Sequence, residues 1–196
     1  MNDLTRRGLI FGAATAAAYG MLLGVQRVCL SAFADDTTPE DTPGPVKIVK
    51  FADDGKKLGL VTLAKVKKST KEWKKQLSPL QYDITRRAAT EWAYSGALFD
   101  QHAAGLYRCI DCDNALFDSG TKFESGTGWP SFWEPIAKEN VYEKTDISNG
   151  GVVRQEVKCT LCEGHLGHVF TDGPEPTGLR YCMNSAALRF IPRDKA

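Results

Sequence analysis

The feature that most constrains this chain is a pair of C-x2-C motifs. The first consists of Cys109 and Cys112 and the second of Cys159 and Cys162, so residues 113–158 separate them. Two thiolates at this spacing can chelate one ion from a tight turn, and two such turns complete a tetrahedral shell. Zinc prefers that geometry, and a closed shell of this kind is structural rather than catalytic. We therefore expect one structural zinc ion that joins an early loop of the folded domain to a late one.

Two other interpretations of these cysteines stay open at the level of sequence. Each pair can be a redox-active motif, or the pairs can form disulfides in an oxidising compartment. The second pair continues into His165 and His168 at the same spacing, so either histidine can also replace a cysteine as a metal ligand. A zinc hydrolase is disfavoured, because a shell of four thiolates leaves no open coordination position.

Composition places the 196-residue chain among ordinary globular proteins. Hydrophobic residues make up 42% and charged residues 25%, which excludes wholesale disorder and collagen-like structure. The formal net charge is +1, so the chain lacks the electrostatic footprint of a nucleic-acid-binding protein. We expect no nucleic-acid partner.

The first 34 residues have the layout of an export signal. A basic start ends in Arg6 and Arg7, residues 8–25 carry no charge, and residues 32–34 supply a small-x-small cleavage pattern. The segment around the two arginines resembles a twin-arginine signal, which carries folded proteins across a bacterial inner membrane. We therefore expect residues 1–34 to be cleaved and the protein to reach the periplasm, meeting the membrane only transiently. An uncleaved membrane anchor is the alternative, because the uncharged stretch approaches the length of a membrane span.

The rest of the chain divides into three parts. Residues 35–45 are rich in proline, threonine and acidic residues and predict a flexible linker. Residues 46–68 contain two alternating segments around a turn signal and predict a β-hairpin extension. Residues 69–192 are expected to form the main folded domain.

Helix and strand signals follow one another within this domain. Ser69 to Glu72 has capping-box spacing before a short helix, and Ser78-Pro79 is suited to begin a second one. From Gly105 onward, short strand-like segments alternate with Gly, Pro, Asp and Asn clusters, which favours a compact antiparallel β domain. The expected strands are residues 106–109, 115–117, 141–146, 152–159, 168–170, 179–183 and 186–191.

Cys29 lies in the expected export signal and would be removed with it, so Cys182 has no partner once the four motif cysteines are paired off. An unpaired cysteine is either a small buried hydrophobe or a reactive thiol. Arg180 and Asn184 flank it, and a cation with hydrogen-bond donors can stabilise a thiolate, which is the nucleophilic form. His165 and His168 lie upstream, and histidine is the natural proton donor near neutral pH.

The aromatic run at residues 126–133 allows two interpretations. Trp129 lies in this run among Gly and Pro residues. The aromatic side chains can belong to the hydrophobic core, or they can form a pocket wall for an apolar, polarisable group such as a thioether methyl. His102 stands apart from the other histidines and is expected in a surface loop.

Together these motifs resemble the methionine-R-sulfoxide reductase family, B type, from about Glu72 to Phe190. The motifs that carry the resemblance, in order, are Cys109-x2-Cys112, Gly126-Thr-Gly-Trp-Pro-Ser-Phe132, Cys159-x2-Cys162, Gly164-His-Leu-Gly-His-Val-Phe170, Asp172-Gly-Pro174 and Arg180-Tyr-Cys-Met-Asn-Ser185. The resemblance implies a mainly β fold in which two packed antiparallel sheets form a small barrel-like domain with short N-terminal helices. It also implies that the four motif cysteines bind structural zinc and that no organic cofactor is needed.

The resemblance assigns chemical roles as well. The thiolate of Cys182 would attack the sulfoxide sulfur while a protonated His165 or His168 assists the departing oxygen. Cys182 would then become a sulfenic acid, the first and reversible step of cysteine oxidation. The remaining family positions are Trp129 and Phe190, which would contact the substrate methyl, and Arg180 and Asn184, which would orient the site.

Thr127 departs from the family pattern, because many relatives carry a second, recycling cysteine there. No other cysteine of the mature chain is free for that task, so we expect a thioredoxin-like protein or a small thiol to reduce Cys182 directly. The substrate would be methionine sulfoxide, free or within oxidised proteins, and the enzyme is expected to be a monomer. The alternative from another class is a non-catalytic zinc-stapled module in which Trp129, Phe132 and Trp133 grip a protein partner.

Overall fold

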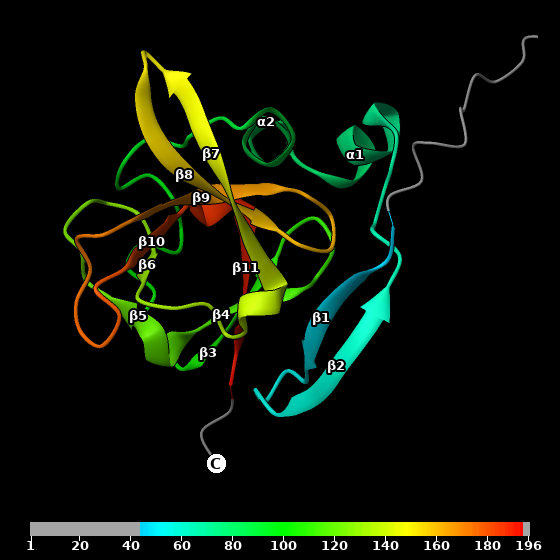
Figure 1. Ribbon diagram of the computed structural model, residues 1–196, viewed down its shortest axis with the longest axis horizontal. Helices are drawn as coiled ribbons and strands as arrows, with labels where there is room; N and C mark the ends of the chain where they lie inside the picture. Colours follow the sequence, from blue (N-terminus) through cyan, green and yellow to red (C-terminus); the bar gives the residue numbers. More distant parts are fainter. Residues whose placement is uncertain (1–43, 194–196) are drawn as a thin grey trace, which may run out of the picture. The chain divides into compact units, whose positions relative to one another are not determined.

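The computed structural model describes residues 44–193 (Figure 1). The expected export signal in residues 1–34 and nearly all of the expected linker lie outside the described residues, so both stay predictions. Within residues 44–193, no helix has the length and apolar character that crossing a membrane requires.

Short strands dominate the described part of the chain. In chain order its strands and helices are β1 (Val46–Phe51), β2 (Lys57–Leu63), α1 (Thr70–Gln76), α2 (Pro79–Arg87), β3 (Gly105–Cys109), β4 (Ala115–Asp118), β5 (Lys122–Phe123), β6 (Ser131–Phe132), β7 (Val141–Asn149), β8 (Val152–Cys159), β9 (His165–Phe170), β10 (Arg180–Met183) and β11 (Leu188–Pro192). Single 3-10 turns occur at Ser119–Thr121, Lys138–Asn140 and Ser185–Ala187.

These strands form three antiparallel sheets. β1 pairs with β2, the central sheet has the order β5-β6-β10-β9-β8-β7, and the third sheet has the order β11-β3-β4. The expectation of a mainly β, antiparallel fold with short helices is confirmed. The expected barrel-like form is wrong, because no sheet of residues 44–193 closes on itself. Closure needs two sheet edges that pair, whereas one edge of the central sheet is β5, a strand of 2 residues.

Both helices begin where the capping signals predict. The Ser69 side chain accepts a hydrogen bond from the backbone N–H of Glu72, and the Glu72 carboxylate accepts one from the backbone N–H of Ser69. Ser78 and Gln81 form the same reciprocal pair at the start of α2, where Pro79 occupies the first helical position. Satisfying the free N–H groups at a helix start makes such short helices stable next to a protein core.

The core lies between the central sheet and the third sheet. Phe132 of β6 stacks on Phe117 of β4 with ring centroids 4.4 Å apart. Val157, Val169 and Tyr181 enter the same core from β8, β9 and β10. Successive residues of a strand project to opposite faces. The residues that flank these three along their strands therefore project from the other face of the central sheet.

Asn140 joins the N-terminal β-hairpin to this core. The predicted hairpin is present as β1 and β2. The buried Asn140 side chain accepts a hydrogen bond from the Val49 N–H at 2.7 Å and donates one to the Val49 carbonyl at 2.8 Å. Arg108 donates to the Phe51 carbonyl at 2.8 Å. The domain boundaries proposed at residues 45/46 and 68/69 stay predictions.

Candidate active site and metal centre

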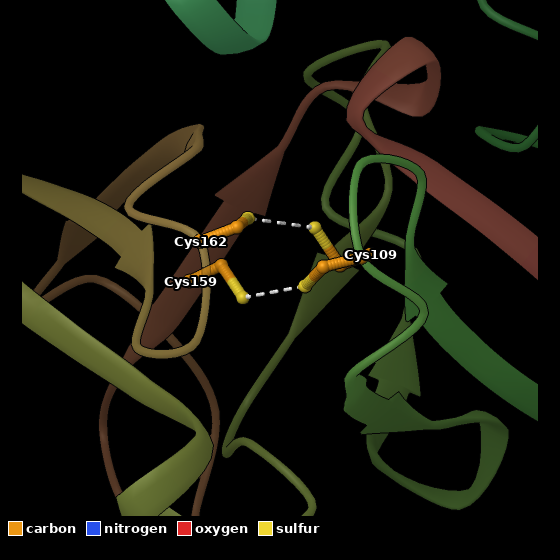
Figure 2. Close-up of side chains that lie close together, drawn as sticks. Cys109, Cys159 and Cys162 are labelled. Carbon is orange, nitrogen blue, oxygen red and sulfur yellow. Dashed lines mark hydrogen bonds between the residues drawn. The ribbon is translucent and has the colours of Figure 1, made fainter. Parts of the chain in front are cut away.

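The two C-x2-C motifs form the turns of two β-hairpins. Cys109 ends β3 and Cys159 ends β8. In the first turn the Asp113 N–H donates to the Cys109 carbonyl at 2.9 Å, and in the second the Glu163 N–H donates to the Cys159 carbonyl at 2.8 Å. Asp113 and Glu163 both have positive φ, at 63° and 59°. The two turns therefore have the same backbone form, and Figure 2 shows sulfurs from the two turns facing one another.

The sulfur positions fit a tetrahedral metal site. Cys109 Sγ lies 3.6 Å from Cys162 Sγ, and Cys112 Sγ lies 3.6 Å from Cys159 Sγ. All four sulfurs lie within 4.8 Å of one another. A tetrahedral zinc site with Zn–S bonds of about 2.3 Å has sulfurs about 3.8 Å apart. The cluster can therefore hold a metal ion such as zinc, and the cysteines of residues 44–193 form no disulfide.

Neither histidine takes part in this cluster, so the alternative of a histidine ligand is wrong. The only group of potential metal ligands found in residues 44–193 consists of the four cysteines. His165 instead places Nδ1 2.8 Å from Glu156 Oε1, and His168 places Nε2 2.9 Å from Asp146 Oδ2. Both imidazoles are thus held by carboxylates.

Cys182 lies in a row of side chains that crosses the central sheet. Its register partners are His168 on β9 and Ser131 on β6, and His168 in turn pairs with Glu156 on β8. Paired residues of antiparallel strands project to the same face. The sheet register therefore brings a thiol, an imidazole and a carboxylate together from three strands.

A cavity of about 150 Å³ opens beside Cys182. Its lining residues are Thr90, Trp129, Arg154, Gly167, His168, Phe170, Cys182, Met183 and Asn184. An apolar cavity of about this volume accommodates benzene, so the space suits one side chain of five or six heavy atoms. The Trp129 indole N–H donates to the Glu91 carbonyl at 3.2 Å, which fixes this ring as a wall of the cavity.

The two histidines have different surroundings. The carboxylate that holds His168, Asp146, also accepts from Arg154 at 2.6 Å, and hydrogen bonds from Ser148 and from His168 hold the pKa of Asp146 well below its usual range. His165 is 1% exposed and its Nε2 atom has no hydrogen-bond partner. Burial lowers the pKa of His165. Only His168 of the two lines the Cys182 cavity, although the two ring centroids are 5.4 Å apart.

Burial raises the pKa of the Cys182 thiol above its usual value. A hydrogen bond with Thr127, whose Oγ1 lies 3.9 Å from Cys182 Sγ, the charge of Arg180 and a hydrogen bond with Ser131 all lower this pKa but do not outweigh burial. The sequence led us to expect a stabilised thiolate. In the structure the donors are present, but desolvation of the half-buried sulfur is the larger effect.

Arg180 and Asn184 are held by other protein groups. The Arg180 guanidinium makes two hydrogen bonds of 2.9 Å to Asp172 and lies over the Phe170 ring at 4.4 Å. The Asn184 side chain accepts from the Glu91 N–H at 3.0 Å and donates to the Leu166 carbonyl at 3.1 Å. Both residues thus fix the walls of the Cys182 cavity.

Phe190 does not line the Cys182 cavity. It lies on β11, its ring centroid is 5.0 Å from that of Tyr107, and it lines a separate cavity with Leu80 and Gly96. Phe170 occupies the aromatic position beside Cys182 instead. It lies two residues after His168 on the same face of β9, so strand alternation was the signal that could have identified it.

Sequence reasoning also missed the acidic partners of the histidines. Asp146 and Glu156 lie in strands with no local motif that marks them. Their roles follow from the pairing of β7, β8 and β9, which only the folded sheet reveals.

Comparison with known proteins identifies the family to which this chain is similar. The SelR domain family model matches residues 77–192, which include the four motif cysteines and Cys182. The chain is 54% identical over 129 residues to the peptide methionine sulfoxide reductase MsrB of Bradyrhizobium diazoefficiens, covering 66% of this chain and 92% of the relative. It is 53% identical over 129 residues to the MsrB of Methylibium petroleiphilum, covering 66% and 93%. It is 54% identical over 125 residues to that of Leptospira interrogans, covering 64% and 95%.

The chain belongs to the MsrB family. The resemblance seen in the sequence motifs is confirmed, and so is the prediction that the protein is an enzyme of the oxidoreductase class. The non-catalytic binding module is accordingly not favoured. The match to the family model begins at Leu77, so β1, β2 and α1 lie outside the segment that this model matches.

Proposed function

We propose that this MsrB-family enzyme reduces the R epimer of methionine sulfoxide to methionine through Cys182. The observation that carries the proposal is the cavity that exposes Cys182 between Trp129 and His168. Its volume suits one methionine sulfoxide side chain. The aromatic faces of Trp129 and Phe170 offer the apolar contact that a sulfur-bound methyl favours. Relatives that are more than 50% identical over the aligned residues are named peptide methionine sulfoxide reductases.

The reaction transfers one oxygen atom to Cys182. The Cys182 sulfur, as thiolate, attacks the sulfoxide sulfur while His168 donates a proton to the sulfoxide oxygen. This attack forms a transient bond between the two sulfurs. The protonated oxygen then moves from the substrate sulfur to the Cys182 sulfur, so the S–O bond of the substrate and the bond between the sulfurs both break. Cys182 becomes a sulfenic acid, and the thioether leaves. The substrate sulfur gains the two electrons that Cys182 loses, and His168 recovers its proton from the original thiol. His168 suits this role better than His165, because His168 lines the cavity, whereas burial lowers the pKa of His165.

An external thiol would complete the cycle. Thr127 Oγ1 lies 3.9 Å from Cys182 Sγ, but a hydroxyl cannot form a disulfide. The other described cysteines belong to the metal cluster. A first thiol would condense with the sulfenic acid to give a mixed disulfide and water, and a second would release Cys182. The donor would be a thioredoxin-like protein or a small thiol.

Mass spectrometry after one turnover tests this chemistry. The reduced, metal-loaded protein is mixed with one equivalent of the R sulfoxide and no reductant. Cys182 is expected to gain the mass of one oxygen atom while one methionine forms per chain. A Cys182→Ser protein is expected to form no methionine. An intramolecular disulfide that includes Cys182 would sink the external-thiol cycle, and methionine formation by Cys182→Ser would sink the proposed function.

We further propose that the bound metal is zinc and that the protein acts in the periplasm after cleavage of residues 1–34. The support for zinc is the donor set of four thiols at tetrahedral spacing. The support for export is the three-part layout of the N-terminal sequence with Arg6 and Arg7.

A further inference from the structure

Trp92 exposes most of its indole ring to solvent, close in the chain to the wall of the Cys182 cavity. Its side chain is 87% exposed, although its neighbour Glu91 is 5% exposed. Tyr94, two residues further, is 59% exposed. Thr90, two residues before Trp92, lines the Cys182 cavity. The exposed rings therefore follow directly on from the cavity wall.

The backbone around Trp92 is anchored on both sides. Before it, the Glu91 carboxylate accepts hydrogen bonds from the N–H groups of Ser185 and Ala186 at 2.5 and 3.0 Å. After it, the Tyr94 N–H donates to the Gly128 carbonyl at 2.9 Å. A Cβ at Gly128, where φ is 89°, would lie 2.7 Å from the Tyr94 nitrogen, so glycine permits this close approach. The indole is thus presented from a fixed backbone, which lowers the entropy cost of binding to it.

The size of the cavity determines which parts of a bound polypeptide stay outside it, near Trp92. About 150 Å³ holds the methionine sulfoxide side chain and little else. The main chain of a bound polypeptide, and the side chains next to the methionine sulfoxide, must therefore lie outside the cavity and cross its rim. Thr90 forms part of that rim, and Trp92 and Tyr94 lie next along the chain.

We propose that Trp92, with Tyr94 beside it, binds the residues that flank methionine sulfoxide in a polypeptide substrate and selects apolar and aromatic flanks. Exposed tryptophan side chains contribute strongly to protein recognition because a rigid indole buries a large apolar area. This inference rests on the proposed function, since it names the sequence context that the same site prefers. A reductant protein is the other possible occupant. The substrate is favoured because its chain must pass the rim wherever its side chain enters the cavity.

Single-turnover rates with two peptides test the inference. One peptide carries phenylalanine on both sides of methionine R-sulfoxide, and the other carries glycine on both sides. The reduced enzyme is expected to reduce the phenylalanine peptide with a kcat/KM about fivefold higher. Trp92→Ala is expected to bring this ratio to about one, and Trp92→Phe to keep most of it. Leu60→Ala, which removes an exposed leucine from β2, is the matched control and keeps the full ratio.

The remaining outcomes distinguish a failure of the proposed function from a failure of the inference about Trp92. A wild-type protein that reduces neither peptide contradicts the proposed function itself. Equal rates for the two peptides, or an unchanged ratio in Trp92→Ala, overturn the inference and leave the proposed function intact. If Trp92→Ala keeps the ratio but slows recycling by thioredoxin and not by dithiothreitol, Trp92 binds the reductant and the substrate inference is wrong.

Discussion

At the scale of single residues, the pKa of the Cys182 thiol is set by two opposing effects, burial and stabilising hydrogen-bond donors. Desolvation raises the pKa of its thiol, while the Thr127 hydroxyl, the Arg180 charge and the Ser131 hydroxyl lower it. Residue types alone suggested Arg180 correctly, but they did not identify Thr127 or Ser131 and gave no measure of burial. The sign of the net shift depends on how far the sulfur is withdrawn from water, which only the fold determines.

The alkylation rate of Cys182 checks this balance. We expect the rate with iodoacetamide to rise with pH through a midpoint above that of an ordinary cysteine thiol, because only the thiolate reacts and burial raises the pKa of Cys182. Thr127→Val removes a hydrogen bond that favours the thiolate, so its midpoint is expected at a still higher pH, whereas Thr127→Ser stays near the wild type. Peptide mass spectrometry separates Cys182 from the cluster cysteines. A wild-type midpoint at or below pH 8 would contradict the account.

Residues of the site differ in how well sequence could predict them. Cys182, His168 and Trp129 carry motif signals, and the structure brings them together. Phe170 and Phe190 are both aromatic residues of late strands, and the choice between them depends on which face of which sheet each one occupies. Linear spacing does not contain that information.

At the scale of elements, the two cysteine turns bring their sulfurs together from two separate sheets. The first turn connects β3 with β4 in the third sheet, and the second connects β8 with β9 in the central sheet. Spacing predicted the four ligands because a C-x2-C turn is a local structure. The start of β9 was predicted three residues late, because a bulge between Val157 and Lys158 interrupts regular alternation there.

Removing the metal is expected to destabilise the contact between these sheets. Cys109→Ser, or treatment with a strong chelator, should release one zinc ion per chain and lower the midpoint of thermal unfolding by on the order of 10 °C. Zinc content is measured by atomic emission and unfolding by calorimetry. Cys182→Ser is the control, expected to keep both the zinc and the midpoint while losing activity. Full thermal stability in the zinc-free protein would refute a structural role for the metal.

At the scale of the whole molecule, local signals predicted the strands better than their assembly. Pattern and turn residues indicated a mainly β domain with two capped helices, and these are present. Whether sheets close depends on pairing between distant edges, and the two-residue strand β5 ends the central sheet. The barrel-like expectation failed at this level.

The N-terminal segment makes a separate prediction about the mature protein. If residues 1–34 are an export signal, the protein recovered from the periplasm of a bacterial host begins at Asp35. Replacing Arg6 and Arg7 by lysine is expected to leave the full-length chain in the cytoplasm, because the twin-arginine route reads both arginines. N-terminal mass analysis of the two cell fractions checks this. A periplasmic chain that retains Met1 would support the membrane anchor instead.

The central claim is that the half-buried thiol of Cys182, in a cavity that fits one side chain, removes oxygen from the R epimer of methionine sulfoxide. Turnover of the separated R and S epimers, with dithiothreitol as reductant, measures this directly. Methionine is expected from the R epimer alone, and from neither epimer when serine replaces Cys182. Reduction of the S epimer at a comparable rate, or undiminished turnover by the serine variant, would contradict the central claim.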